Sequence, residues 1–106
     1  MTLNQMFTER DWLTIGKFVS PQGLNGKIRV NPSSDFPERF TKAGPRWIQE
    51  NLEDPQKIVL LSGKQIPGKS IYIVSIEEIN DRKSAESLIG KKLLVPASDR
   101  PKLKAN

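Results

Sequence analysis

Residues 12–30 read WLTIGKFVSPQGLNGKIRV, a stretch rich in β-branched and aromatic residues. Such residues favour extended backbone, so we expect a strand that runs from Trp12 to Val19. The turn-forming run Ser20 to Gly23 is expected to break this strand. Successive side chains of a strand point to opposite faces, which gives two alternating sets: Leu13, Ile15 and Val19, and Trp12, Thr14 and Phe18.

A second strand is predicted at residues 27–31, after a turn that contains two glycines. In KIRVN the apolar Ile28 and Val30 alternate with the basic Lys27 and Arg29, which indicates a half-buried strand with a basic outer face. The turn itself carries one apolar side chain, Leu24. From the residues alone, Leu24 either plugs the end of a barrel or stands exposed as an anchor for a partner.

Four further strand segments follow at 46–49, 57–62, 69–79 and 91–96, separated by stretches rich in Gly and Pro. The segment FPERF at 36–40 suits one short helical turn that places two aromatics over a barrel end. One helix is predicted late in the chain, capped by Asn80 or Asp81 and stopped by Gly90. Its apolar stripe is Ala85, Leu88 and Ile89.

Short strands, Gly and Pro turns and a single late helix predict a mainly all-β fold, a small antiparallel β-barrel. A sandwich needs similar strands, although closing the sheet would bury its edges. We expect a lead-in at 1–11, the barrel at 12–96 and a basic linker or tail at 97–106. The predicted core residues are Ile15, Ile28, Val30, Val59, Leu61, Ile71 and Ile73.

Composition excludes several classes of function. The chain has no Cys and no His, which leaves no disulfide, no thiolate metal site and no His base, so we expect neither an enzyme nor a metal or other cofactor. No apolar run approaches the length of a membrane helix, and a cytoplasmic protein is the simplest expectation. The 17 basic and 12 acidic residues give a net charge of +5, which mildly favours an anionic partner.

Three ordered blocks between residues 12 and 96 resemble the N-terminal domain of the RimM-type ribosome maturation factors. The first combines a Gly-Lys-x-Val strand, Gly16 to Val19, with a Gly-Leu-x-Gly loop, Gly23 to Gly26. The second is the run from Ser34 to Phe40, which resembles Thr-Asp-x-Pro-Glu-Arg-Phe. The third extends from Asp81 to Pro96 and resembles Asp-Arg-x-x-Ala-Glu-x-Leu-x-Gly with its following strand.

The resemblance implies a six-stranded barrel that associates with the immature small ribosomal subunit (30S). It also implies roles in 16S rRNA processing and in assembly of the subunit head, beside a ribosomal protein. Gln22 stands where the family usually has His, and its amide can hydrogen-bond but cannot act as an acid or base, which favours a binding surface. The family's second domain, a PRC-type barrel, would follow the linker and is absent from this sequence.

The predicted ribosome-binding or rRNA-binding site lies mainly on the first two strands and their connection. Lys17, Lys27 and Arg29 are expected to contact phosphates, which positions a protein without specifying base sequence. Leu24 is the expected apolar anchor. The full set is Lys17, Gln22, Gly23, Leu24, Asn25, Gly26, Lys27, Arg29 and Arg39.

Plainer roles are expected for several other residues. Arg39 has a local ion pair with Asp35 or Glu38 as its leading interpretation. The acidic Glu77, Glu78 and Asp81 do not predict a metal site, because neighbours on a strand face opposite ways. The aromatics Trp12, Trp47 and Tyr72 are expected to pack in the core.

Two rival functions remain open. A general RNA-binding barrel acting off the ribosome would present stacking aromatics on an exposed sheet face. A hydrolase or nuclease would need a metal cluster or an activated base, and the sequence offers neither.

Overall fold

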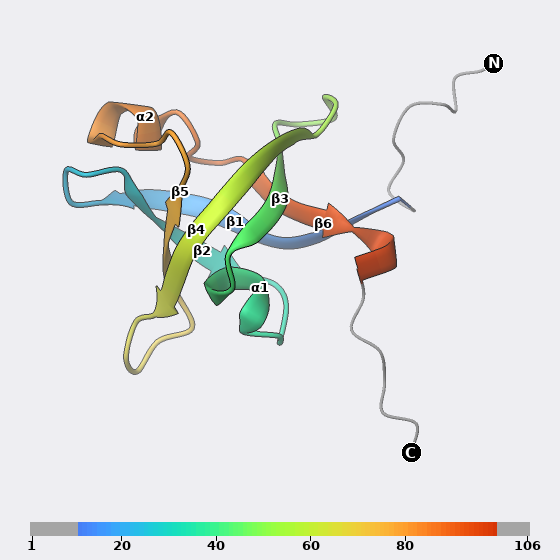
Figure 1. Cartoon of the computed structure of the whole chain (residues 1–106), viewed down its shortest axis with the longest axis horizontal. Coiled ribbons are helices and arrows are strands. Elements are labelled where there is room, and N and C mark those ends of the chain that lie inside the picture. The colour runs from blue at the N-terminus through green and yellow to red at the C-terminus, as the bar shows by residue number, and fades with distance from the viewer. Residues whose placement is uncertain (1–10, 100–106) are drawn as a thin grey trace.

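The computed structural model describes residues 11–99, in which six strands close into an antiparallel barrel (Figure 1). Around the barrel the strands run in the order β1-β2-β5-β4-β3-β6. Closure confirms the predicted barrel and excludes the sandwich. The strands are β1 (Trp12–Gln22), β2 (Lys27–Pro32), β3 (Gly44–Gln49), β4 (Gln56–Gln65), β5 (Tyr72–Ile76) and β6 (Lys92–Pro96).

Strand β1 is longer than its sequence predicts, because it passes through the expected break at Ser20 and ends at Gln22. Its register shifts twice, between Thr14 and Gly16 against β6 and between Phe18 and Ser20 against β2. Each shift changes which face the following side chain meets. Ile15 and Phe18 are therefore both fully buried, whereas Val19 is exposed, and simple alternation assigned Phe18 and Val19 wrongly.

The core confirms the predictions for Ile15, Ile28 and Val30, which are fully buried. The predictions for β4 and β5 are wrong by one residue: Leu61 is 50% exposed, and Val59 and Ile73 are only half-buried, as is Ile71 directly before β5. Both strands contain consecutive apolar residues, so alternation does not say which set faces inward. The side chains that these two strands bury are Leu60, Tyr72, Val74 and Ile76.

Helix α1 (Glu38–Thr41) closes one end of the barrel, as a short turn after Pro37. Phe40 is fully buried and stacks on Tyr72 with ring centroids 4.6 Å apart, whereas Phe36 is exposed and does not cover the barrel end as predicted. The backbone of Phe40 lies so close to Gly63 that a Cβ there would collide with its carbonyl oxygen. Any side chain at position 63 would therefore require the backbone of α1 at Phe40 to shift.

The buried guanidinium of Arg46 fixes α1 to β3. It donates to the carbonyl oxygens of Glu38, Arg39, Lys42 and Pro45, which include acceptors left open at the helix C-terminus. Burial lowers the pKa of Arg46 from its ordinary value; the charge of Asp99 partly opposes this effect and the charge of Arg39 adds to it. The side chain is thus a structural tie that makes four hydrogen bonds to backbone carbonyls.

Helix α2 (Arg82–Glu86) is the predicted late helix, whereas α1 extends the short helical turn predicted at residues 36–40 to Thr41. Asp81 caps it, because its Oδ1 accepts from the Ser84 amide at 2.7 Å. Ala85 and Leu88 are buried as predicted, but Ile89 is 38% exposed because the helix ends early. A short 3-10 turn, η2 (Ala97–Asp99), follows β6 inside the segment expected to be a linker.

The two tryptophans lie outside the core cluster, contrary to prediction. Their rings pack against each other, 5.2 Å apart and tilted by 55°, and both are half-buried. Trp47 is the direct partner of Leu94 on β6, which is almost fully buried yet is also absent from that core cluster. The pair therefore forms a small apolar cover on the outer wall, while Tyr72 sits in the core as predicted.

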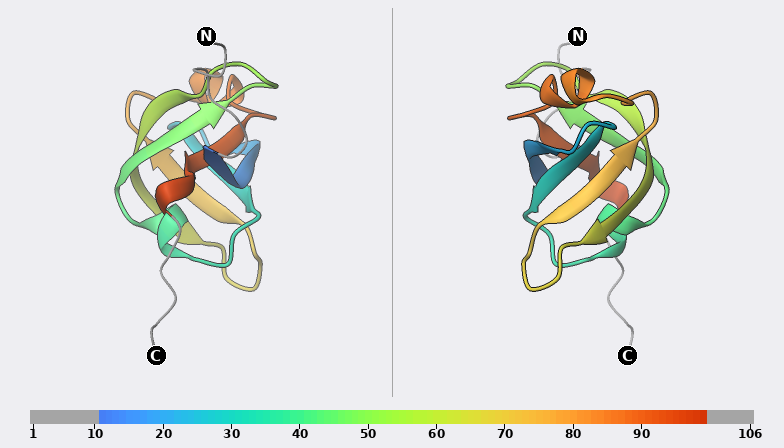
Figure 2. Two further views of the ribbon diagram at one scale, coloured as in Figure 1. Left: turned by 90° about the vertical axis from the view of Figure 1, so that its right-hand side faces the viewer. Right: turned by 90° about the vertical axis from the view of Figure 1, so that its left-hand side faces the viewer.

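Charge is divided between the wall and the ends of the barrel. None of the six strands contains Asp or Glu, whereas they carry Lys17, Lys27, Arg29, Arg46, Lys57, Lys64 and Lys92. Acidic residues occupy turns and helices, which Figure 2 places at the two ends of the barrel, with α2 and the β3–β4 turn at one end and α1 at the other. The wall is therefore the part of the surface suited to an anionic partner.

Candidate nucleic-acid interface

The connection between β1 and β2 is a tight turn at residues 23–26 whose tip presents Leu24. Leu24 is 73% exposed, so it does not plug the barrel end. Gly23 and Gly26 have φ angles of 75° and 95°, a region that side chains with a Cβ rarely adopt. The two glycines allow the chain to reverse and leave Leu24 and Asn25 facing solvent.

The turn is supported from α2 and from the segment before it. Arg82 Nη1 donates to the carbonyl oxygen of Gly23 at 3.2 Å, and its Nε pairs with Glu86 at 3.3 Å. Gly26 is buried against the backbone of Ile79, so closely that a Cβ would collide with the Ile79 carbonyl oxygen. Sequence reasoning missed the role of Arg82, although the residue lies in one of the three recognised blocks.

Gln22 orients Arg29 at the base of the turn. The Arg29 Nε donates to Gln22 Oε1 at 2.6 Å, across the β1–β2 pairing. Both side chains are half-buried on the outside of the barrel. The bond uses Nε, so it leaves the two terminal nitrogens of Arg29 available, and no hydrogen bond of theirs occurs within residues 11–99.

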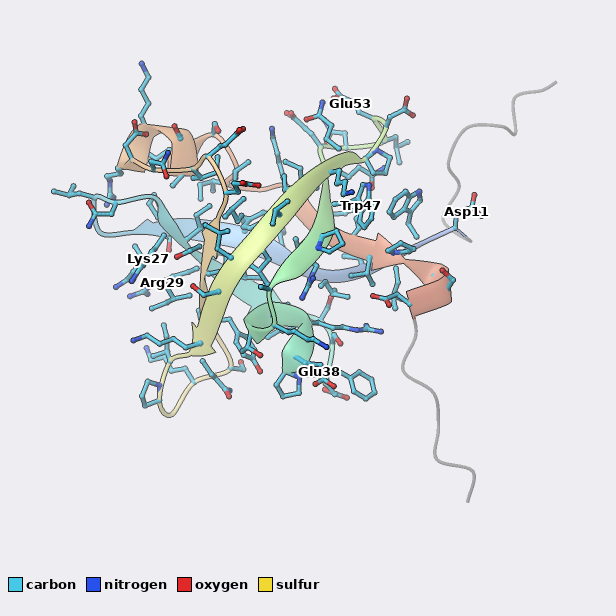
Figure 3. All side chains as sticks on the ribbon, in the orientation of Figure 1. Asp11, Lys27, Arg29, Glu38, Trp47 and Glu53 are labelled. Atoms are coloured by element: carbon cyan, nitrogen blue, oxygen red, sulfur yellow. The ribbon has the colours of Figure 1, made fainter. Side chains whose placement is uncertain are left out.

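Lys17 and Lys27 complete the basic surface of these strands. Both are exposed, and Figure 3 shows Lys27 and Arg29 leaving β2 on the same side of the barrel. Lys17 lies on β1, where it pairs with Asn31 on β2 and with Lys92 on β6. The ion pairs of the described residues are Arg82–Glu86 and Lys91–Glu50, so none of these three cations is neutralised by a carboxylate there.

Arg39 lies apart from this surface, on α1 at the other end of the barrel (Figure 1). It is 8% exposed and donates to Ser34 Oγ at 3.2 Å and to the Asp99 carbonyl oxygen at 3.4 Å. Its guanidinium lies 5.3 Å from the centre of the Phe36 ring. The predicted ion pair with Asp35 or Glu38 is wrong, because Arg39 instead ties α1 to the loop before it and to η2.

The described residues lack two kinds of feature. They contain no group of three or more Asp, Glu, His or Cys positioned to hold a metal ion. Within the same range, no helix has the length and apolar character needed to cross a membrane. The geometry of the exposed turn and its cations suits binding.

Comparison with known proteins shows to which family the chain belongs. The family model described as the RimM N-terminal domain matches residues 13–100. The chain belongs to the RimM family. A ribosome maturation factor RimM of Prochlorococcus marinus is 65% identical over 92 residues, which are 87% of this chain and 52% of that protein. Ribosome maturation factor RimM of a Synechococcus species is 52% identical over 96 residues, 91% of this chain and 55% of that protein.

Solved RimM structures share the fold. A crystal structure of a RimM protein from Pseudomonas aeruginosa superposes with a TM-score of 0.68 at 22% identity, covering 89% of this chain and 56% of that one. The solution structure of the N-terminal domain of RimM from Thermus thermophilus gives 0.64 at 18% identity, covering 88% of this chain and 98% of that domain. The chain thus spans about half the length of the curated RimM relatives that it matches.

Proposed function

We propose that this RimM domain is a non-catalytic assembly module that binds the immature 30S subunit and assists 16S rRNA processing and head assembly. Its partners would be 16S rRNA and a ribosomal protein of the subunit head, in the cytoplasm. The relatives named ribosome maturation factor RimM support the process. The observation that carries the proposal is Leu24, exposed on a braced turn beside uncompensated cations.

The physical argument starts from the turn. A large apolar side chain at 73% exposure contributes little to folding and gains most when a partner removes it from water. The hydrogen bond from Arg82 and the packing of Gly26 hold the turn in place, so little conformational freedom remains to be lost on binding. Leu24 would therefore act as an apolar anchor of the kind that dominates interface energy.

The cations supply the second part of the interface. Lys17, Lys27 and Arg29 would contact rRNA phosphates, which releases counterions and orients the domain without reading bases. Gln22 would aim Arg29, while Gly23, Asn25 and Gly26 shape the turn. Arg39 is too deeply buried to reach a partner as the domain stands, and its proposed part is indirect, through the position of α1.

The direct test is co-sedimentation of the chain with immature and with mature 30S subunits. Selective retention by the immature particle is the expected result. Equal binding to both particles, or none to either, would contradict the proposal. Repeating the measurement with a C-terminal extension taken from a full-length relative would show how much affinity resides in this domain.

Charge is tested by the double variant Lys27→Gln and Arg29→Gln. Since each phosphate contact contributes to the salt dependence, the slope of log affinity against log salt should flatten by about one to two units. Melting temperature should hardly move, because both side chains lie on the outer wall. An unchanged slope would remove β2 from the interface.

A general RNA-binding role off the ribosome is the second candidate, favoured by one observation. The Trp12–Trp47 pair lies outside the core, as a base-stacking surface would. Its rings are tilted against each other and cover Leu94, which leaves no flat platform. This candidate predicts equal affinity for the immature subunit and for unrelated single-stranded RNA, so the latter serves as the competitor in the sedimentation assay.

A further inference from the structure

A shallow trough runs over the outer face of three neighbouring strands, with β5 as its floor and β2 and β4 as its banks. Register places Arg29 opposite Ile73, and Ile73 opposite Lys64. The pairing of Ile28 with Val74 brings Lys27 alongside Ser75, which in turn pairs with Ser62. Outward-facing positions therefore form two rows, each reaching from a basic residue on β2 to β4.

The trough follows from side-chain size. The outward residues of β5 are a serine and a half-buried isoleucine, whereas the banks carry long basic chains. A hollow of about 220 Å³ lies between them, lined by Lys27, Ser62, Gly63, Lys64, Ile73 and Ser75. Since adjacent strands lie about 4.8 Å apart, the two banks are separated by roughly 10 Å at the backbone.

The polar groups of the trough are not used within the protein. No hydrogen bond or ion pair of the Lys27, Lys64, Ser62 or Ser75 side chains occurs in the part of the chain that the structure describes. None of the three strands carries an acidic residue. The trough thus combines cations on both banks with two free hydroxyls in and beside its floor.

We propose that this trough binds the phosphodiester backbone of an RNA strand, with Lys64 opposing Lys27 and Arg29. The inference rests on the proposed function for the rRNA partner and adds the path that the RNA takes across the barrel. Arg29 presents its two terminal nitrogens for a bidentate phosphate contact, because Gln22 already holds its Nε. Ser62 and Ser75 donate to phosphate oxygens, and the absence of an aromatic side chain from the lining makes recognition independent of base identity.

RNA fits this trough better than an acidic protein segment does. A protein strand that docks on a sheet commonly gains affinity by pairing with an exposed edge. Here β5 is paired on both sides, to β2 and β4, and the barrel is closed, so no edge is offered. The cations on β2 and on β4 match the repeated charges of a nucleic-acid backbone. A nucleic acid can bind them without pairing to a sheet edge.

The test measures binding of a 16S rRNA transcript to the parent chain, to Lys64→Gln and to Lys42→Gln across a series of salt concentrations. Lys42 is the matched control, because it is exposed at the C-terminus of α1, outside the strands of the basic wall, and the change in net charge is the same. Lys64→Gln should flatten the salt slope by about 0.7 to 0.9, the amount expected for one phosphate contact, and Lys42→Gln should not. The double change Ser62→Ala and Ser75→Ala should weaken binding several-fold without altering the slope.

Several outcomes would overturn the trough. Equal effects of Lys64→Gln and Lys42→Gln would mean that only net charge matters. Displacement of the transcript by polyglutamate at equal charge, with the same dependence on Lys64, would assign the trough to acidic proteins. If Lys64→Gln loses its fold by circular dichroism, Lys64→Arg takes its place, and a flattened slope with that charge-preserving variant would also contradict the proposal.

The two proposals fail separately. If the parent chain sediments with immature subunits but Lys64→Gln does not change transcript binding, the trough proposal is wrong and the assembly role stands. If transcript binding depends on Lys64 but immature subunits are not preferred, the trough stands and the assembly role is wrong.

Discussion

The two glycines of the β1–β2 turn carry different structural demands. Gly23 has a positive φ of 75° but open space around the position of a Cβ, whereas Gly26 has a φ of 95° and lies against the backbone of Ile79. The sequence suggests that both positions allow unusual backbone. It does not show the contact with Ile79, because that contact joins residues 53 positions apart and depends on the fold.

Gly23→Ala and Gly26→Ala should therefore separate these demands. Replacing Gly23 should cost about 1 kcal/mol of unfolding free energy, from the backbone conformation alone. Replacing Gly26 should cost more than about 2 kcal/mol, because the new methyl group also displaces Ile79 or the turn. Urea denaturation of both variants measures the difference in unfolding free energy. Equal losses would show that the backbone at Ile79 can move aside at little energetic cost.

Among single residues, those whose role depends on local chemistry were the predictable ones. The position of Leu24 between two glycines indicates either an exposed anchor or a plug of the barrel end, and its exposure to solvent excludes the plug. Asp81 was recognised as a possible helix cap from its place before the apolar stripe. The contacts of Arg39 with η2 and of Trp47 with β6 were not predictable, because both join residues distant in sequence.

At the scale of the elements, β4 shows where alternation stops being informative. Leu60 is 1% exposed and Leu61 is 50% exposed, although the two are chemically identical neighbours. The register shift between Leu60 and Ser62 against β5 adds to the ambiguity, since a bulge changes the phase of the strand. The existence of all six strands was predictable, but the inward face of a strand apolar on both sides was not.

The pair Leu60→Ala and Leu61→Ala tests this register. Leu60→Ala should cost roughly 2 to 5 kcal/mol, because it removes a buried side chain and leaves a cavity. Leu61→Ala should stay within about 1 kcal/mol, since half of that side chain is already in water. Denaturant midpoints report both values, and a reversed order would place the opposite face of β4 in the core.

Helix α2 is short enough for its cap to matter. The amide of Ser84 donates to Asp81, and this hydrogen bond lowers the pKa of the Asp81 carboxyl below its ordinary value, with help from the Ser84 hydroxyl. A carboxyl whose pKa is lower in the folded state stabilises the fold at pH values above its ordinary pKa. That stabilisation disappears as the pH falls through the folded-state pKa.

Asp81→Ala should accordingly lower the melting temperature at neutral pH. The gap between parent and variant should stay constant down to about pH 5 and shrink below about pH 4, as Asp81 takes up a proton first in the unfolded chain and then, at lower pH, in the folded parent. Asp81→Asn serves as the control, because its amide oxygen can still accept the Ser84 bond without a titrating charge. A gap that persists at pH 2 would assign the effect to packing.

For the whole molecule, closure of the barrel determines how the charges are displayed. The basic residues of β2 and β4 lie on one continuous wall because β5 pairs with both strands. This arrangement brings together strands that β3 separates in the sequence. For this reason Lys27 and Arg29 could be proposed from the sequence, whereas Lys64 and the trough could not. The absence of acidic residues from the strands likewise becomes visible once the strand limits are known.

The most direct test of the account compares two exposed leucines at different hairpin turns. Leu24 lies beside the basic wall, whereas Leu52 is 81% exposed in the acidic β3–β4 turn. We expect Leu24→Ala to leave stability within about 0.5 kcal/mol and to lower affinity for the immature 30S subunit at least about tenfold, the effect of removing an apolar anchor. Leu52→Ala should change neither quantity, and undiminished binding by Leu24→Ala, or equal losses for the two variants, would contradict the account.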